Sequence, residues 1–124
     1  MIPIQWKQND KKTMHVNEAE NGVVYLTWPA IEKIEGIRHA FSTRIGGVSK
    51  EHLSRGDDPA NVRENYRRFC EAAGFEVENI VTSDQTHTTK VRYVTKADCG
   101  SGVTRDRDFH DIDGMITDEP GVVL

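Results

Sequence analysis

The sequence has 124 residues, of which 36% are hydrophobic and 29% are charged, with a formal net charge of −4. This length and composition predict one soluble globular domain over residues 1–124. The acidic balance and the lack of any lysine or arginine cluster argue against a nucleic-acid binder, which normally carries a basic face. No apolar run approaches the roughly 20 residues that span a bilayer, and residues 1–7 lack the apolar core of a signal peptide. We therefore expect a cytoplasmic protein that does not contact a membrane.

Two strands and one helical turn are expected early in the chain. Residues 23–28 are rich in β-branched and aromatic side chains, which favours a strand that ends before Pro29. Residues 31–34 fit a single helical turn, and residues 37–42 form the next expected strand. His39 lies between apolar neighbours of that strand, where we expect a structural histidine rather than a ligand.

Residues 59–73 carry the clearest helical pattern. Asp58 can cap the free N–H groups at its start, and Gly74 fits the position just after its last turn. The polar face places Glu64 four residues before Arg68, a spacing that suits an ion pair. Apolar side chains recur every three or four residues on the other face: Val62, Tyr66, Phe69, Cys70 and Ala73.

The remaining residues predict short strands joined by loops. Strands are expected at 79–82, 90–95 and 112–117, and a further one begins at 121. Residues 96–111 are expected to form a polar loop. Strands, one good helix and then more strands predict an α+β fold with a mixed β-sheet. The last strand reaches the end of the sequence as an unfinished element, and its open edge predicts self-association.

The first candidate site is the stretch FSTRIGGVS at residues 41–49, a strand that runs into a tight turn with Arg44 at the corner. Gly46 and Gly47 permit a positive φ or a close backbone approach. A guanidinium beside exposed backbone N–H groups makes a seat for phosphate or carboxylate. The alternative is an ordinary hairpin turn next to a surface arginine.

The second candidate is His87, which lies among hydroxyl and amide side chains between two expected strands. An imidazole on an exposed turn can bind a metal or transfer protons, and the alternative is a plain polar surface residue. Two cysteines are too few for a disulfide framework. We expect Cys70 to be a buried or half-buried helix residue and Cys99 to be an unreactive loop thiol. The aspartates of the last third either shape turns or orient a ligand, and we favour turns for Asp113 and Asp118.

Four motifs, in this order, resemble the bacterial YfiH-like family, also described as multicopper polyphenol oxidase or laccase-domain proteins. They are FSTRIGGVS at 41–49, GDDP at 56–59, QTH at 85–87 and DGMITD at 113–118. The resemblance implies an α/β sandwich of CNF/YfiH-like architecture. It also implies zinc-dependent purine nucleoside phosphorylase and adenosine deaminase activity, with a purine nucleoside and phosphate as the binding partners.

The resemblance further implies roles for individual residues. His87 matches the first of the family's three zinc ligands and is expected to be catalytic. Arg44 is expected to be catalytic and to bind phosphate together with Gly46, Gly47 and Ser49.

The match to the family pattern is incomplete. The family's other two zinc ligands come from ADC and HAGW segments that follow the stretch ending here at Leu124, so the chain resembles the N-terminal part of a family member. An ADC sequence ending at Cys99 lies before that stretch, and Cys99 is therefore not assigned as a ligand. His110 with Asp111 is a weak substitute. The loop at 50–55 is shorter than the family's, which bears on substrate binding.

Three other functions remain open. A copper polyphenol oxidase needs many histidine ligands, and five scattered histidines with no HxH pair speak against it. A non-catalytic interaction module is favoured for this polypeptide alone by the missing ligands and the short loop. A hydrolase that uses Cys99 with His87 or His110 ranks last, because no nearby cationic cluster is evident to activate the thiol.

Overall fold

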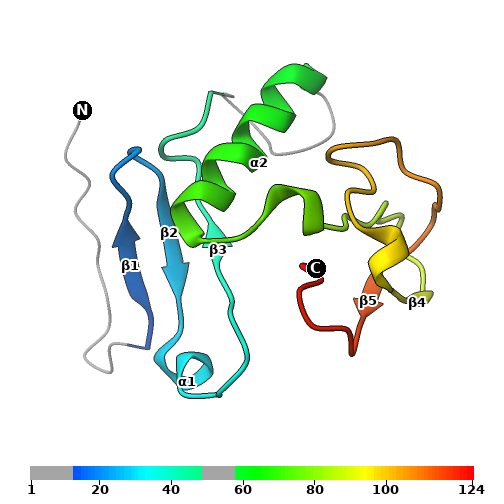
Figure 1. Cartoon of the computed structure of the whole chain (residues 1–124), viewed down its shortest axis with the longest axis horizontal. Coiled ribbons are helices and arrows are strands. Elements are labelled where there is room, and N and C mark those ends of the chain that lie inside the picture. The colour runs from blue at the N-terminus through cyan, green and yellow to red at the C-terminus, as the bar shows by residue number, and fades with distance from the viewer. Residues whose placement is uncertain (1–12, 49–57) are drawn as a thin grey trace.

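The computed structural model describes residues 13–48 and 58–124, which form two small sheets and one main helix (Figure 1). The first sheet is antiparallel, in the order β1-β2-β3. Its strands are β1 (His15–Glu18), β2 (Val24–Thr27) and β3 (Phe41–Ser42). A short helix, α1 (Pro29–Glu32), follows β2 directly. The expected strand at 23–28 and the expected helical turn after it are thus confirmed.

The expected strand at 37–42 is wrong over most of its length, because only its last two residues pair with β2. Residues 38 and 39 make side-chain hydrogen bonds in place of the backbone pairing of a strand. His39 accepts the backbone N–H of Trp28 at its Nε2, over 2.7 Å. Arg38 turns towards the end of the main helix, donates to the carbonyl of Ala73 and lies over the Phe75 ring. His39 is therefore a structural histidine, as expected.

The main helix, α2, runs Pro59–Ala73, as predicted. The carboxylate of Asp58 accepts the N–H of Ala60, and Gly74 follows the last turn with a φ of 80°. The expected ion pair also forms, with 2.9 Å between Arg68 Nε and Glu64 Oε1. The helix lies across the first sheet in Figure 1, where the ring of Phe69 on α2 meets Tyr25 edge-on.

The opposite side of α2 packs against the second half of the chain. Cys70 is only 2% exposed and forms one core cluster with Ile80 and Val103. Burial raises the pKa of its thiol to about 11, so Cys70 is an inert packing residue, as expected. A second cluster gathers Val81, Val94 and Phe109 under the second sheet.

The second sheet is a parallel pair, β4 (Val91–Tyr93) with β5 (Gly114–Ile116). The described residues therefore form one antiparallel and one parallel sheet with one main helix, which confirms a mixed α and β structure, and neither of the two sheets is itself mixed. The expected strand at 79–82 is also wrong. Its first residues close the 3₁₀ turn η1 (Val77–Asn79), and Ile80 then makes an isolated parallel bridge to Val123.

The expected polar loop at 96–111 proves to be partly buried. It begins with the 3₁₀ turn η2 (Lys96–Asp98), and Asp98 is only 6% exposed. The carboxylate of Asp98 accepts the N–H of Thr95 and a guanidinium N–H of Arg92, each over 2.9 Å. Arg92 in turn lies over the Phe109 ring, with its guanidinium carbon 4.4 Å from the ring centroid. Local side-chain bonds give this segment a fixed shape that its composition does not reveal.

The turn after β3 packs directly on the backbone of the first sheet. Gly46 has a φ of 89°, and a Cβ atom placed on it would lie 2.5 Å from the Cα atom of Val23. Both features match the expectation for this glycine. Within the described ranges, no helix is long and apolar enough to cross a membrane.

We expect Gly46→Ala to destabilise the protein by about 2–5 kcal/mol, from left-handed strain of about 1–2 and overpacking of about 1–3. Gly36→Ala is the matched control, because Gly36 has a φ of 81° with open space around it. It should cost only the strain, about 1–2 kcal/mol. Urea unfolding of the two variants measures the difference, and equal losses would refute a tight contact at Val23.

Asp98 should make the stability depend on pH in acid. The Thr95 N–H, followed by Arg92, holds the pKa of Asp98 below its ordinary value of 3.8. The ionised carboxylate therefore stabilises the fold above that pH, and this contribution is lost as the pH falls through the lowered pKa. At neutral pH we expect Asp98→Asn to lose about 1–3 kcal/mol. The gap to wild type should close in acid unfolding scans, whereas the exposed Asp106→Asn should stay close to wild type throughout.

Candidate functional site

The corner that carries Arg44 is held to the first sheet by Thr43. The hydroxyl of Thr43 donates to the carbonyl of Val24 over 2.6 Å and accepts the N–H of Ile45 over 3.3 Å. The N–H of Val24 then donates to the carbonyl of Ile45. These bonds fix the backbone on both sides of Arg44, which is exposed. Arg44 has no ion-pair partner within residues 13–48 and 58–124.

Helix α2 holds the far side of the same turn. Asn65 is 5% exposed, and its side-chain carbonyl accepts the N–H of Val48 over 2.8 Å. Arg68 donates to the carbonyl of Gly46 over 3.2 Å while it pairs with Glu64. A Cβ atom on Gly47 would lie 2.8 Å from Asn65 Oδ1, so this glycine allows the helix to come close.

The free groups of the turn suit an anion. Thr43 and Asn65 occupy the N–H groups of Ile45 and Val48. Within the described ranges, the N–H groups of Gly46 and Gly47 have no hydrogen-bond acceptor. Two such donors next to a guanidinium without an ion-pair partner in the same ranges can bind phosphate by charge-assisted hydrogen bonds. Ser49, the other residue expected to bind phosphate, lies outside the described residues, as does the short 50–55 loop.

His87 lies in the other half of the molecule, on a turn before β4. Its side chain is exposed and its φ is 64°, a left-handed value that is uncommon for a residue with a Cβ atom. Asp113, just before β5, accepts the N–H of Thr86 over 3.0 Å and the hydroxyl of Thr88 over 3.4 Å. The N–H groups of Thr88 and Thr86 lower the pKa of the Asp113 carboxyl. Asp113 thus shapes a turn.

The residues around His87 do not make up a zinc site. His110 Nδ1 lies 3.4 Å from an oxygen of Asp84, and Asp111 accepts the hydroxyl of Thr86. No three histidine, cysteine, aspartate or glutamate side chains converge anywhere in the described ranges. A zinc ion needs at least three protein ligands, so this part of the chain offers His87 as one ligand at most.

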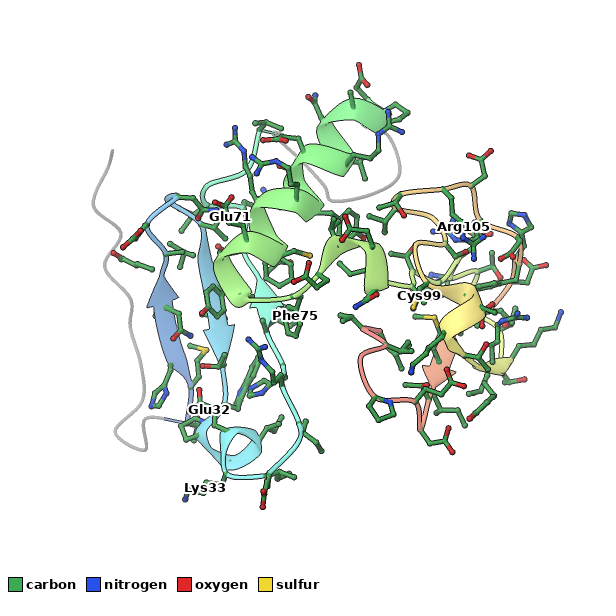
Figure 2. All side chains as sticks on the ribbon, viewed as in Figure 1. Glu32, Lys33, Glu71, Phe75, Cys99 and Arg105 are labelled. Carbon is green, nitrogen blue, oxygen red and sulfur yellow. The ribbon has the colours of Figure 1, made fainter. Side chains whose placement is uncertain are left out.

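Cys99 takes part in a structural network in the C-terminal half, where Figure 2 shows it close to Arg105. Its thiol lies 3.7 Å from the carbonyl oxygen of Asn79. Arg105 donates to the carbonyls of Cys99 and Ala97, over 3.1 and 3.0 Å. These contacts place Cys99 in a loop, as expected, and its reactivity stays a prediction.

A wide cleft with a volume of about 1,730 Å³ separates the two halves of the molecule. Residues 36–42 and α2 line one side, and residues 102–107 and 117–124 line the other. Neither Arg44 nor His87 lines this cleft, so the structure does not bring the two expected site residues together there.

Arg107 is a cationic residue of this cleft that the sequence analysis missed. Its guanidinium donates to the hydroxyl of Thr82 over 2.7 Å and to the carbonyl of Thr82 over 3.3 Å. The partners are 25 residues apart in the sequence, and no local pattern indicates such a pair.

Comparison with known proteins identifies the family to which this chain is similar. The model of the family described as multi-copper polyphenol oxidoreductase laccase matches residues 38–124. A purine nucleoside phosphorylase YlmD from Geobacillus stearothermophilus is 36% identical in an alignment 95 residues long, which covers 68% of this chain and 34% of the relative. A purine nucleoside phosphorylase from Deinococcus radiodurans is 32% identical in an alignment 94 residues long, which covers 71% of this chain and 33% of the relative.

The fold agrees with these sequence matches. The crystal structure of YlmD from Geobacillus stearothermophilus superposes with a TM-score of 0.65 at 31% identity, covering 86% of this chain and 42% of that one. The chain spans about a third of the length of the curated relatives it matches. All four motifs lie within the matched residues 38–124. The chain belongs to the multi-copper polyphenol oxidoreductase laccase family, the YfiH-like family that its motifs resemble.

Proposed function

We propose that this protein takes part in the phosphorolysis of purine nucleosides, converting adenosine or inosine and phosphate into the free base and ribose 1-phosphate. The observation that carries the proposal is the guanidinium of Arg44, which has no ion-pair partner among residues 13–48 and 58–124 and stands on a turn that is fixed from both sides. The similarity of this chain to proteins named purine nucleoside phosphorylase supplies the substrate class. Adenosine deamination stays a prediction of the family resemblance.

Phosphorolysis requires a cation and N–H donors that bind phosphate, and the turn at Arg44 carries both. In phosphorolysis, a phosphate oxygen bonds to the ribose C1′ while the C1′–N9 bond to the purine breaks. The electron pair of that bond leaves with the base, which takes up a proton. Phosphate must be held beside C1′, and Arg44 with the N–H groups of Gly46 and Gly47 supplies donors for its oxygens. Ser49 is the next donor along the chain.

Among the described residues, His87 is the one metal ligand that we propose. We propose zinc rather than copper, with His87 as one ligand; when bound in an open site, zinc polarises water or substrate. The other ligands would come from outside the described residues. We also propose that the two sheets belong to the α/β sandwich that the family resemblance implies.

Arg44→Ala should raise the KM for phosphate roughly 10- to 100-fold, because one charge-assisted contact contributes about 1.5–3 kcal/mol. The KM for the nucleoside should change much less. Lys33→Ala is the matched control, since Lys33 is an exposed cation beside α1, far from the turn in Figure 2. Release of base from inosine at varied phosphate concentrations measures the effect.

The same assay separates the alternatives. Equal KM values for phosphate in the two variants would refute the role of Arg44. Oxidation of phenols with bound copper, without base release, would favour the polyphenol oxidase. A protein that folds but shows neither activity would favour the interaction module.

A further inference from the structure

Arg107 differs from the other half-buried arginines of the described residues, because it has no carboxylate partner there. Arg68 pairs with Glu64 and Arg92 pairs with Asp98, each over 2.9 Å. Arg107 is half-buried like them, yet it forms no ion pair with any residue in 13–48 or 58–124. A cation that is partly removed from water is unfavourable without a counter-ion. An anion beside Arg107 would therefore stabilise it.

Thr82 holds Arg107 so that one end of the guanidinium stays free. The Nε and Nη2 atoms of Arg107 donate to the carbonyl and the hydroxyl of Thr82, over 3.3 and 2.7 Å. These two bonds use the side edge of the planar group. The N–H groups at its end, on Nη1 and Nη2, have no further acceptor among the described residues. Two parallel N–H groups in this arrangement match two oxygens of a carboxylate or a phosphate.

Gly102 supports the same guanidinium from another direction. Its φ is 79°, and a Cβ atom placed on it would lie 2.7 Å from Nη2 and 3.1 Å from Cζ of Arg107. The absence of a side chain thus allows the loop to lie against the guanidinium. Arg107 is held by Thr82 and by this loop, so it loses little side-chain freedom when it binds a ligand.

Tyr66 of α2 lines the same cleft as Arg107, Thr82 and Gly102. Its side chain is half-buried, and its hydroxyl has no hydrogen-bond partner in the part of the chain that the structure describes. Burial raises the pKa of Tyr66, whereas the positive charge of Arg107 acts in the opposite direction. The phenol is therefore close enough to Arg107 to sense its charge, and its hydroxyl can donate to the same anion.

We propose that Arg107 and Tyr66 form an anion site in the cleft, for a small molecule that carries a carboxylate or phosphate group. The free end of the guanidinium binds two oxygens of that group, and the Tyr66 hydroxyl donates a further hydrogen bond. This site is separate from the proposed phosphate seat, because Arg44 does not line the cleft. The inference therefore goes beyond the proposed function and does not depend on it.

Arg63 provides a matched control within the same cleft. It lines the α2 side, is exposed and has no ion-pair partner in the described ranges. Arg107→Lys and Arg63→Lys both keep the positive charge and remove a planar guanidinium. Tyr66→Phe removes only a hydroxyl group.

The test titrates ¹⁵N-labelled protein with inorganic phosphate and, separately, with acetate, with sodium chloride at equal ionic strength as the reference. The Nε–H signal of Arg107 and the amide of Gly102 report binding in the cleft. We expect saturable shifts of both signals, and the anion that binds more tightly identifies the group that the site prefers. Affinity should fall roughly tenfold or more in Arg107→Lys, about two- to tenfold in Tyr66→Phe and less than twofold in Arg63→Lys.

Shifts at Arg107 and Gly102 that never saturate, or that chloride reproduces, would overturn the inference. Equal losses in the two lysine variants would do so as well, and an unchanged affinity in Tyr66→Phe would exclude its hydroxyl from the site. The titration of the wild-type protein decides the question even if a variant fails to fold, which thermal unfolding reveals. The proposed function fails separately, if phosphate leaves the amides of Gly46 and Gly47 unshifted.

Discussion

The contact between the glycine turn and helix α2 is the constraint on which the candidate phosphate site depends. Gly46 lies so close to Val23 that a side chain would not fit, and Asn65 binds the N–H of Val48 from the buried face of the helix. Arg68 completes the contact at the carbonyl of Gly46. A site that binds phosphate by orientation needs a rigid backbone, and here rigidity comes from packing and not from a long strand.

The same helix joins this site to the rest of the molecule. Phe69 packs on the first sheet, whereas Cys70 packs on Ile80 and Val103 of the second half. The turn of His87 belongs to that second half, where Asp113 fixes it to the start of the parallel pair. The two candidate residues are therefore held by separate sets of contacts, and a change in one set should leave the other largely intact.

The parts of the fold that depend on local chemistry could be predicted from the sequence. The bounds of α2 follow from Asp58, the helical spacing of apolar residues and Gly74, all of which act within a few residues. The errors arose where side chains replaced backbone pairing over long sequence separations. His39 takes the N–H of Trp28, and Asp98 organises a segment whose composition resembles a solvated loop.

Some features of the candidate site could likewise be predicted from local sequence, and others could not. The glycine turn and its exposed arginine were predictable, because positive φ and close approach are properties of glycine itself. The anchoring of that turn by Asn65 and the pairing of Arg107 with Thr82 involve residues 17 and 25 positions apart, which no local pattern reveals. Nor could the sequence show that neither Arg44 nor His87 lines the wide cleft.

The central claim, that the Arg44 turn is a seat for phosphate, is tested most directly by titrating ¹⁵N-labelled protein with inorganic phosphate and following the backbone amides. The account predicts saturable shifts at Gly46 and Gly47 that disappear in Arg44→Ala. Sulfate should compete for the same amides, since both anions offer tetrahedral oxygens. Shifts confined to the cleft around Arg107, or none at the glycine turn, would contradict it.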